Sequence, residues 1–459
     1  MIKRLAMKRL ATGVLPLCVV ACLVLGGASN GGFWANLVLQ MGAILLLVWS
    51  FWTPALRRHT RPERFLALLI VGAGLVALLQ FLPLPTSLWE MLPGRGEIAS
   101  VNRIAGIDPA WMLLGLFPHQ ALAALLWTLP SLAALAFMLR REPYHGRWLA
   151  VAIVTVMVVS VVVSALQLSG GPQSPLYFYE ITNRGSAVGF FANSNHQASL
   201  LLVSIPFLAA LGSHCRRLAP GPRLAGLAVL AVAGVLVLVG VYVNGSLAGY
   251  GLALPVLGAS IVILVPTSPL RRWIPMLLVP LVASGLAVLL LSHDGQQLLA
   301  QGTGVSSGTR DVIFARTWRA VGDFFPIGSG LGSFAEVYRT YEPVHGVDWA
   351  HVNHAHNDYL ELLLETGLAG GIVIAGFLAW WGARAARIWV SLSSDSYALA
   401  GVIASATLLI HSLVDYPLRT AGLSVVFAIC CALMTRWATG DPLPFERRQG
   451  RYFDCGVHC

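Results

Sequence analysis

Long apolar segments recur along the chain and decide its structural class. Each has about 17–23 residues, the length that a helix needs to cross the hydrocarbon core of a bilayer. Short stretches rich in arginine, glycine and proline separate them. The sequence therefore predicts an all-α polytopic membrane protein with about twelve transmembrane helices. The expected spans are 11–28, 33–53, 65–83, 119–139, 148–168, 196–213, 224–243, 250–266, 274–292, 360–382, 397–414 and 421–438.

Composition agrees with a membrane protein and excludes a nucleic-acid partner. Of the 459 residues, 57% are hydrophobic and 11% are charged, and the mean hydropathy is +0.73. The net charge of +10 would suit a nucleic-acid binder. The basic residues are scattered between apolar segments, however, and form no single stripe.

The basic residues instead indicate the orientation of the chain. With a cytoplasmic N-terminus, 22 of the 30 basic residues fall in cytoplasmic segments and 8 in the longer outer loops. This is the positive-inside pattern, and it places both termini in the cytoplasm. The basic start and the apolar stretch that follows resemble a signal peptide, which we interpret as an uncleaved first helix.

The seven cysteines predict no outer disulfide. Cys18, Cys22, Cys430 and Cys431 lie within spans, and Cys215, Cys455 and Cys459 lie on the cytoplasmic side. The tail residues Cys455, His458 and Cys459 allow a metal cluster, but a reduced terminal tail is the preferred interpretation.

Polar residues concentrate in three outer segments, 84–118, 169–195 and 293–358. The last is the largest, and we expect one short helix at 309–323 and another at 333–341. The run from Gly328 to Gly332 resembles a phosphate-binding loop only superficially, because no strand precedes it. We interpret it as a turn.

Histidines gather at the end of the largest outer segment. His351, His354 and His356 fall within six residues, just before an apolar helix. Asp358 and Glu361 have the spacing of a capping box, with Asp358 as N-cap. His356 and Asn357 then precede a helix N-terminus, where the dipole favours an anion and disfavours imidazolium.

This arrangement suits a neutral His356 acting as a general base on an anionic substrate, with His354 and Asn357 beside it. Two alternatives stay open. The histidines are polar loop residues, or a metal site forms from His345, His351, His354 and His356. The spacing of these histidines fits no standard zinc pattern.

Outer arginines are candidates for phosphate binding, because a guanidinium donates two parallel hydrogen bonds to phosphate oxygens. Arg184 stands before the sixth span, and Arg310 enters the first loop helix. For both we favour a functional role over surface charge. Arg316 is a further candidate, whereas an ion pair with Asp323 explains Arg319.

Polar residues also stand at the outer ends of two spans. Asn193 and Asn195, at the head of the sixth span, either bind a sugar or cap the helix. His411, Asp415 and Arg419 lie at the outer end of the eleventh span and are expected to face the same cavity. A structural pair of Asp415 with Arg419 is at least as consistent with the sequence as direct chemistry. The central parts of the spans hold almost no charged residue, which argues against an ion-coupled transporter.

Several motifs together resemble the bacterial O-antigen ligase and O-antigen polymerase family of membrane glycosyltransferases. They are Arg184 with the run 189–195, the run 308–310, the run 325–334 and the run 354–370, with a weaker echo at 411–419. The resemblance implies about twelve helices with one large periplasmic loop bearing short helices. It implies a multi-pass protein of the bacterial inner membrane, a glycan donor carried on undecaprenyl diphosphate, and no cofactor or metal ion.

The resemblance also implies roles for individual residues. Arg184 and Arg310 would hold the donor diphosphate, and His356 would activate the acceptor, which is a glycan or the lipid A core. Many relatives carry a Ser-Arg pair where Ser246-Leu247 stands here. A diphosphate contact is therefore either missing or supplied by Arg316 or Arg419. The departure at Leu247 slightly favours a polymerase over a ligase.

The resulting organisation has N-terminal transmembrane helices over 1–168 and a catalytic region over 169–382 that includes the loop 293–358. C-terminal transmembrane helices follow over 383–439, then a cytoplasmic tail over 440–459. We expect an inverting, metal-independent glycosyltransferase of surface-polysaccharide biosynthesis. The alternatives are a polysaccharide or lipid transporter with a periplasmic gate, and a sensor or scaffold.

Overall fold

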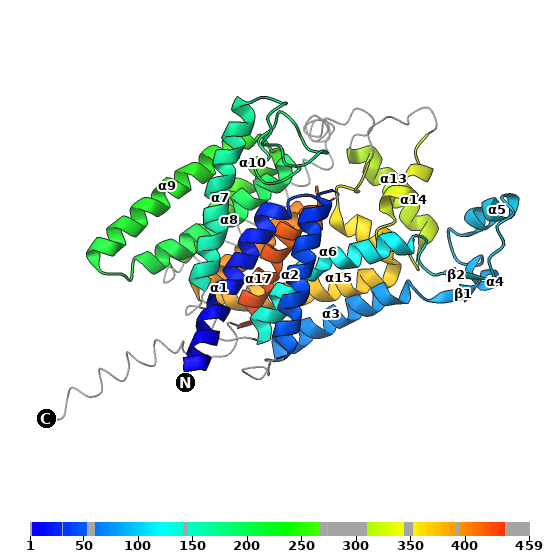
Figure 1. Cartoon of the computed structure of the whole chain (residues 1–459), viewed down its shortest axis with the longest axis horizontal. Coiled ribbons are helices and arrows are strands. Elements are labelled where there is room, and N and C mark those ends of the chain that lie inside the picture. Colours follow the sequence, from blue (N-terminus) through cyan, green and yellow to red (C-terminus); the bar gives the residue numbers. More distant parts are fainter. Residues whose placement is uncertain are drawn as a thin grey trace.

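The computed structural model describes residues 2–29, 31–52, 60–140, 146–265, 273, 310–343, 352–391 and 395–436. Over these ranges the chain is predominantly helical (Figure 1). Eight of the described helices are long and apolar enough to cross a membrane: α2 (Phe33–Trp52), α3 (Arg61–Leu79), α6 (Pro118–Arg140), α7 (Gly146–Ser169), α8 (Ser194–Cys215), α9 (Pro220–Asn244), α10 (Leu247–Leu264) and α15 (Asp358–Val390).

Three shorter apolar helical segments belong to α1 (Ile2–Leu25), α16 (Ser396–His411) and α17 (Ala421–Arg436). The predicted all-α polytopic class is thus confirmed. The expected span at 274–292 lies outside the described residues, as do His345, His351 and the tail 440–459. The total of twelve spans therefore stays a prediction.

One predicted span is displaced toward its N-terminus. The expected span 65–83 is the helix Arg61–Leu79. Its start is fixed because Glu63 accepts a hydrogen bond from the backbone N–H of Thr60 at 2.7 Å. Its end is fixed because the chain next forms β1 (Pro83–Pro85), which pairs antiparallel with β2 (Trp111–Leu113), with Leu84 opposite Met112.

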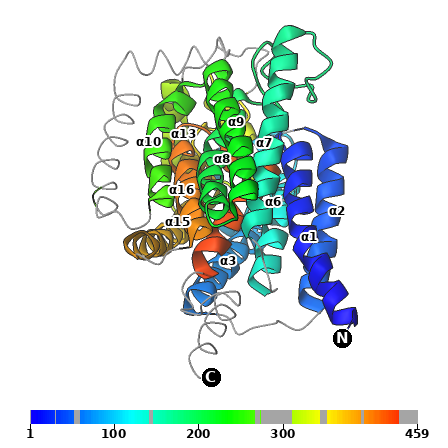
Figure 2. The ribbon, with the colours of Figure 1, turned by 90° about the vertical axis from the view of Figure 1, so that its left-hand side faces the viewer.

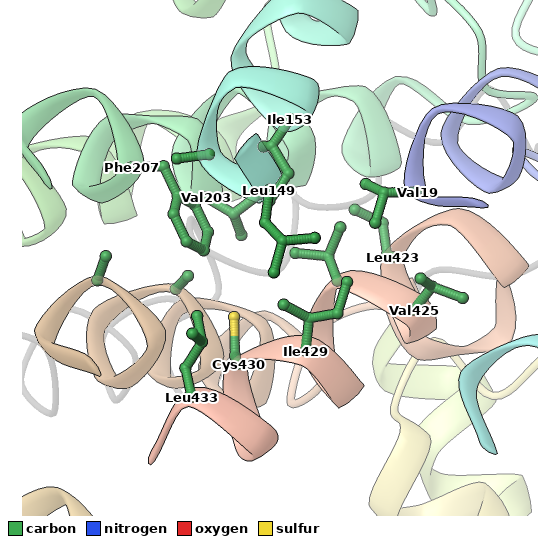
Figure 3. Packing of buried hydrophobic residues seen from close by; sticks show 14 of the residues in the cluster. Val19, Leu149, Ile153, Val203, Phe207, Leu423, Val425, Ile429, Cys430 and Leu433 are labelled. Carbon is green, nitrogen blue, oxygen red and sulfur yellow. The ribbon is translucent and has the colours of Figure 1, made fainter. Parts of the chain in front are cut away.

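Helix α8 is the centre of the bundle. It packs against α7, α9, α10 and α16, and Figure 2 shows it among the first three of these. In the apolar part of α8, 72% of the residues are buried, against 17% in α3. Side chains of α1, α7, α8 and α17 interlock in this core, as Figure 3 shows for Val19, Leu149, Phe207 and Ile429. Association between helices in a bilayer depends on such close packing.

Elements outside the spans form what we call the polar end of the bundle. They are β1, β2, α4 (Thr86–Trp89), α5 (Gly96–Ile104), α13 (Arg310–Phe324), α14 (Phe334–Thr340) and the turn 352–357. Helices α13 and α14 confirm the two short helices predicted at 309–323 and 333–341. A second apolar cluster, which includes Ile313, Phe334 and Ala355, packs them with the turn against Leu364 of α15.

A buried arginine joins two parts of the polar end. Arg95 is fully buried, and its Nη2 donates to the carbonyls of Leu114 and Gly328 at 2.9 and 2.8 Å. Its guanidinium lies over the ring of Phe324, 5.7 Å from the centroid. The segment with α5 is thereby fastened to the loop that follows α13.

Helix α15 is broken at Gly367, where the prediction had an unbroken span at 360–382. Gly367 has φ 57° and ψ −147°, a conformation that only glycine adopts readily. The loop 326–330 occupies the break: the N–H groups of Ser329 and Gly330 donate to the carbonyls of Leu364 and Glu365, both at 2.9 Å. Non-helical backbone at the end of a span is stable here because this loop satisfies it.

Candidate active site

The N-cap of α15, at the end of the turn 352–357, lies one residue earlier than predicted. Asn357 accepts, through Oδ1, hydrogen bonds from two backbone N–H groups of α15 at 3.1 and 3.0 Å. The predicted capping box is therefore wrong: Asp358 is the first residue of α15, and Glu361 accepts from the N–H of Ala355. Asparagine caps a helix as well as aspartate does, so the earlier residue takes the position.

His356 precedes this cap and faces a carboxylate from another part of the chain. Its Nδ1 lies 3.4 Å from Oδ1 of Asp415, which is longer than the ~2.8 Å of an optimal charge-assisted hydrogen bond. The His356 side chain is 13% exposed and that of Asp415 is fully buried. A carboxylate beside Nδ1 favours the tautomer in which Nε2 is the free acceptor.

The surroundings of Asp415 keep it ionised. Burial raises its pKa, but the charge of the nearby His356 acts in the opposite direction. The charges of His196 and Arg310 add to this effect and hold the pKa of Asp415 well below its usual range. The site therefore combines a permanent buried negative charge with a partly accessible imidazole.

Arg310 lies near the same carboxylate. It is the first residue of α13 and is 5% exposed. Burial lowers its pKa, whereas the charge of Asp415 acts to raise it. Its Nε has no hydrogen-bond partner among the described residues. Since a guanidinium offers five N–H donors, Arg310 has donor capacity left for an anion.

Tyr416 links three histidines, and sequence reasoning missed its part in the site. Its ring centroid lies 4.3 Å from that of His354, and 5.0 Å from those of His356 and His196. Burial raises the pKa of Tyr416 and keeps its hydroxyl protonated. Two features of the sequence point to this cluster. Tyr416 follows Asp415 in a polar run, and His196 stands at the head of a span.

Asn193 and Asn195 are partly structural. Asn193 caps α8 by accepting from the N–H of Asn195 at 2.8 Å, and its side chain lies close enough to Tyr416 to lower the pKa of that hydroxyl. Asn195 accepts from the hydroxyl of Ser246 at 2.7 Å. That bond lies at the start of α10, where Leu247 is the first helical residue. Capping is thus confirmed for Asn193, which also reaches the site.

One interpretation of the sequence paired Arg419 with Asp415, but the structure does not show this pair. It lies in the 3-10 helix η3 (Pro417–Arg419), 3.4 Å from Asp358, 3.3 Å from Glu361 and 3.4 Å from Glu365. Burial lowers its pKa, but the charges of these carboxylates outweigh burial and raise it. The chain leaves the helical conformation between α16 and η3. Arg419 therefore faces α15, where carboxylates about one helical turn apart surround it.

Two predicted arginines have described contacts elsewhere, whereas the carbonyl of His411 accepts from the N–H of Asp415 at 2.9 Å. Arg184 is exposed, donates to the carbonyl of Pro172 at 3.3 Å and lies over the ring of Tyr177. Arg316 donates to the hydroxyl of Tyr338 at 3.4 Å. His411 is fully buried, with Nδ1 2.7 Å from the hydroxyl of Ser199.

A metal centre finds no support in the residues that the structure describes. Within them, no group of three or more histidines, cysteines, aspartates or glutamates has an arrangement that could hold a metal ion. His354 instead directs Nδ1 at Glu361, 2.9 Å away. His345 and His351, which completed the alternative metal site, lie outside the described ranges.

Comparison with known proteins shows a family similarity for one segment of the chain. Residues 232–375 match a family model described as O-antigen ligase, and no curated protein matches the chain. The matched segment contains Arg310, His354 and His356, and it ends before Asp415 and Arg419. This family comprises membrane enzymes of surface-polysaccharide biosynthesis that act on lipid-linked glycans. The matched segment is less than half of the chain, and over it the chain is similar to the O-antigen ligase family.

Proposed function

We propose that the chain is a glycosyltransferase that moves a glycan from undecaprenyl diphosphate to a sugar hydroxyl at the periplasmic face of the inner membrane. The observation that carries the proposal is the pair of His356 and Asp415, 3.4 Å apart, with the buried Arg310 close by. A base and a cation in one place match the two demands of the reaction, which are proton removal and stabilisation of a leaving diphosphate.

In the proposed reaction, Nε2 of His356 accepts the proton of the acceptor hydroxyl. The hydroxyl oxygen forms a bond to the anomeric carbon of the donor as the bond from that carbon to the diphosphate oxygen breaks. The electron pair of the broken bond stays on undecaprenyl diphosphate, which needs no proton to leave. A single displacement of this kind inverts the anomeric centre.

The charged residues have separate parts in this scheme. Asp415 holds the tautomer of His356 and stabilises the imidazolium that forms. Arg310 binds the diphosphate through guanidinium N–H groups, of which the one on Nε has no partner among the described residues. Arg184, exposed on the loop before α8, is proposed to meet the same diphosphate when the donor binds. Arg419 is excluded from this role because three carboxylates already surround it.

The test is a transfer assay with purified protein and an undecaprenyl-diphosphate-linked oligosaccharide. Release of undecaprenyl diphosphate is measured for the wild type, for His356→Ala and for His119→Ala. His119 is an exposed histidine at the start of α6 and serves as the matched control. We expect His356→Ala to lose about 10²–10⁴-fold in rate, as for removal of a general base, and His119→Ala to keep it. Full transfer by His356→Ala contradicts the proposal.

Ligase and polymerase are separated by the glycans of cells that lack the gene. Shortened surface chains identify a polymerase, and unattached lipid-linked chains identify a ligase. Absence of an arginine at Leu247, where many relatives have one, slightly favours the polymerase.

A further inference from the structure

Glu361 makes two hydrogen bonds to consecutive residues of the turn that ends at His356. Its Oε1 lies 2.9 Å from Nδ1 of His354, and its Oε2 accepts from the backbone N–H of Ala355 at 2.8 Å. The side chain of Glu361 is 1% exposed. Because a carboxylate only accepts, the proton of the first bond belongs to Nδ1 of His354.

The backbone of His356 needs such support. Its φ of 50° is the one positive value that the described residues show outside glycine. For a side chain larger than hydrogen this region costs about 1–2 kcal/mol. It persists where neighbouring contacts fix the chain on both sides. Asn357 is fixed by capping α15, and Ala355 is fixed by Glu361 and is fully buried.

Glu361 also reaches the segment that carries Asp415. Its Oε1 lies 3.3 Å from Nη2 of Arg419, four residues after Asp415. One buried carboxylate on α15 therefore contacts both chain segments whose approach places His356 beside Asp415.

We propose that Glu361 is a positioning residue, which sets His356 against Asp415 by holding the N–H groups of His354 and Ala355. The inference rests on the proposed function and assigns His354 a new part in it. His354 acts as a hydrogen-bond donor to Glu361, and its imidazole takes no proton from the substrate.

The first experiment compares Glu361→Gln with Glu365→Gln in the transfer assay. Glu365 lies one helical turn later and is 3.4 Å from Arg419, but its described hydrogen bonds and ion pairs include neither His354 nor Ala355. Glutamine has an NH2 group in place of one of the two carboxylate oxygens, so one of the two N–H groups loses its acceptor. We expect Glu361→Gln to lower kcat by about 10²-fold, the effect of a small misplacement, with the KM for the lipid-linked donor unchanged. The kcat of Glu365→Gln should fall by less than about tenfold. Equal losses in the two variants, or a change confined to KM, overturn the inference.

The second experiment tests the same contact without altering the buried carboxylates. The side-chain amide of asparagine places an N–H group where Nδ1 of histidine lies, so His354→Asn keeps the donor and removes the imidazole. We expect His354→Asn to retain at least about tenfold more kcat than His354→Ala, since one positioning hydrogen bond is at stake. Equal inactivity of the two variants assigns chemistry to the imidazole and overturns the inference.

His356→Ala, assayed alongside, distinguishes a failure of the proposed function from a failure of the inference on Glu361. Full transfer by that variant overturns the proposed function and this inference with it. Loss of transfer in His356→Ala with wild-type kcat in Glu361→Gln overturns the inference alone.

Discussion

Ser412 and Asp358 join the end of one helix to the start of another. The hydroxyl of Ser412 donates to Oδ2 of Asp358 at 2.7 Å, and the backbone N–H of Asp358 donates to the carbonyl of Ser412 at 3.0 Å. The end of α16 is thereby fixed to the start of α15. This contact lies between the segments that carry His356 and Asp415.

Ser412→Ala should therefore weaken the junction without removing it. The variant loses one buried hydrogen bond and leaves an oxygen of Asp358 less well paired, which costs about 1–3 kcal/mol. We expect a lower unfolding midpoint in detergent and a modest loss of transfer. Ser424→Ala is a suitable control, because its hydroxyl bonds the carbonyl of Ala421 within its own helix. Equal midpoints for Ser412→Ala and the wild type would contradict the role of this contact.

Asp415→Asn should lower the transfer rate more than it lowers stability. The amide can no longer stabilise imidazolium at His356, and we expect a loss of about 10²–10⁴-fold in kcat. The stability cost should be about 2 kcal/mol, the range for a mispaired buried group. Rate and thermal midpoint are measured on the same preparation. A loss of rate no larger than the loss of folded protein would argue against a role in the reaction.

The stability contribution of Asp415 has a defined pH window. Its pKa in the folded protein is lowered from an ordinary value near 3.9. The contribution is therefore complete above about pH 4 and is lost as the pH falls through the lower folded-state pKa. The difference in unfolding midpoint between wild type and Asp415→Asn should persist from pH 5 to pH 8 and narrow in stronger acid. A difference that disappears between pH 7 and pH 5 would contradict the lowered pKa.

Arg419 and Arg184 should give opposite phenotypes. Arg419→Gln leaves three buried carboxylates without their cation and should destabilise the protein by about 3–5 kcal/mol. Arg184→Ala removes an exposed side chain, so the unfolding midpoint should hold while the KM for the lipid-linked donor rises. Thermal unfolding and donor titration of both variants check this contrast. A destabilised Arg184→Ala with unchanged KM would remove Arg184 from the donor site.

Gly367→Ala tests the break in α15. A methyl group there is strained by the positive φ and would collide with the backbone of the loop 326–330. We expect destabilisation of about 2–4 kcal/mol and loss of transfer. Gly371→Ala is the matched control, since a methyl group there meets only Leu363 at an ordinary 3.5 Å. Equal stability of the two variants would show that the break tolerates a side chain.

The presence of the described apolar helices, which follows from local sequence, was predicted correctly. The described apolar segments form helices because their length and composition suit a bilayer. Helix α13 begins within one residue of its prediction. The cap of α15 was misplaced by one residue because Asn357 and Asp358 are both good caps, and sequence alone does not rank them.

The candidate site was predictable in part, because its residues come from distant segments. The cluster at His354 and His356 is local and visible in the sequence. The partners of Arg419 are not visible in the sequence, because Asp415 is closer along the chain whereas Glu361 and Glu365 are closer in space. His196 and Tyr416 join the site only through the meeting of α8 with the segment after α16.

The loop held in the break of α15 has a consequence for how the protein matures. The carbonyls of Leu364 and Glu365 obtain their partners from Ser329 and Gly330, about 35 residues earlier in the chain. Residues 368–390 can enter the bilayer as an ordinary helix, but the stretch that leads to His356 is complete only after this earlier loop has docked. We therefore expect insertion of the chain and assembly of the site to be separate events, so that a variant can pass the first while failing the second.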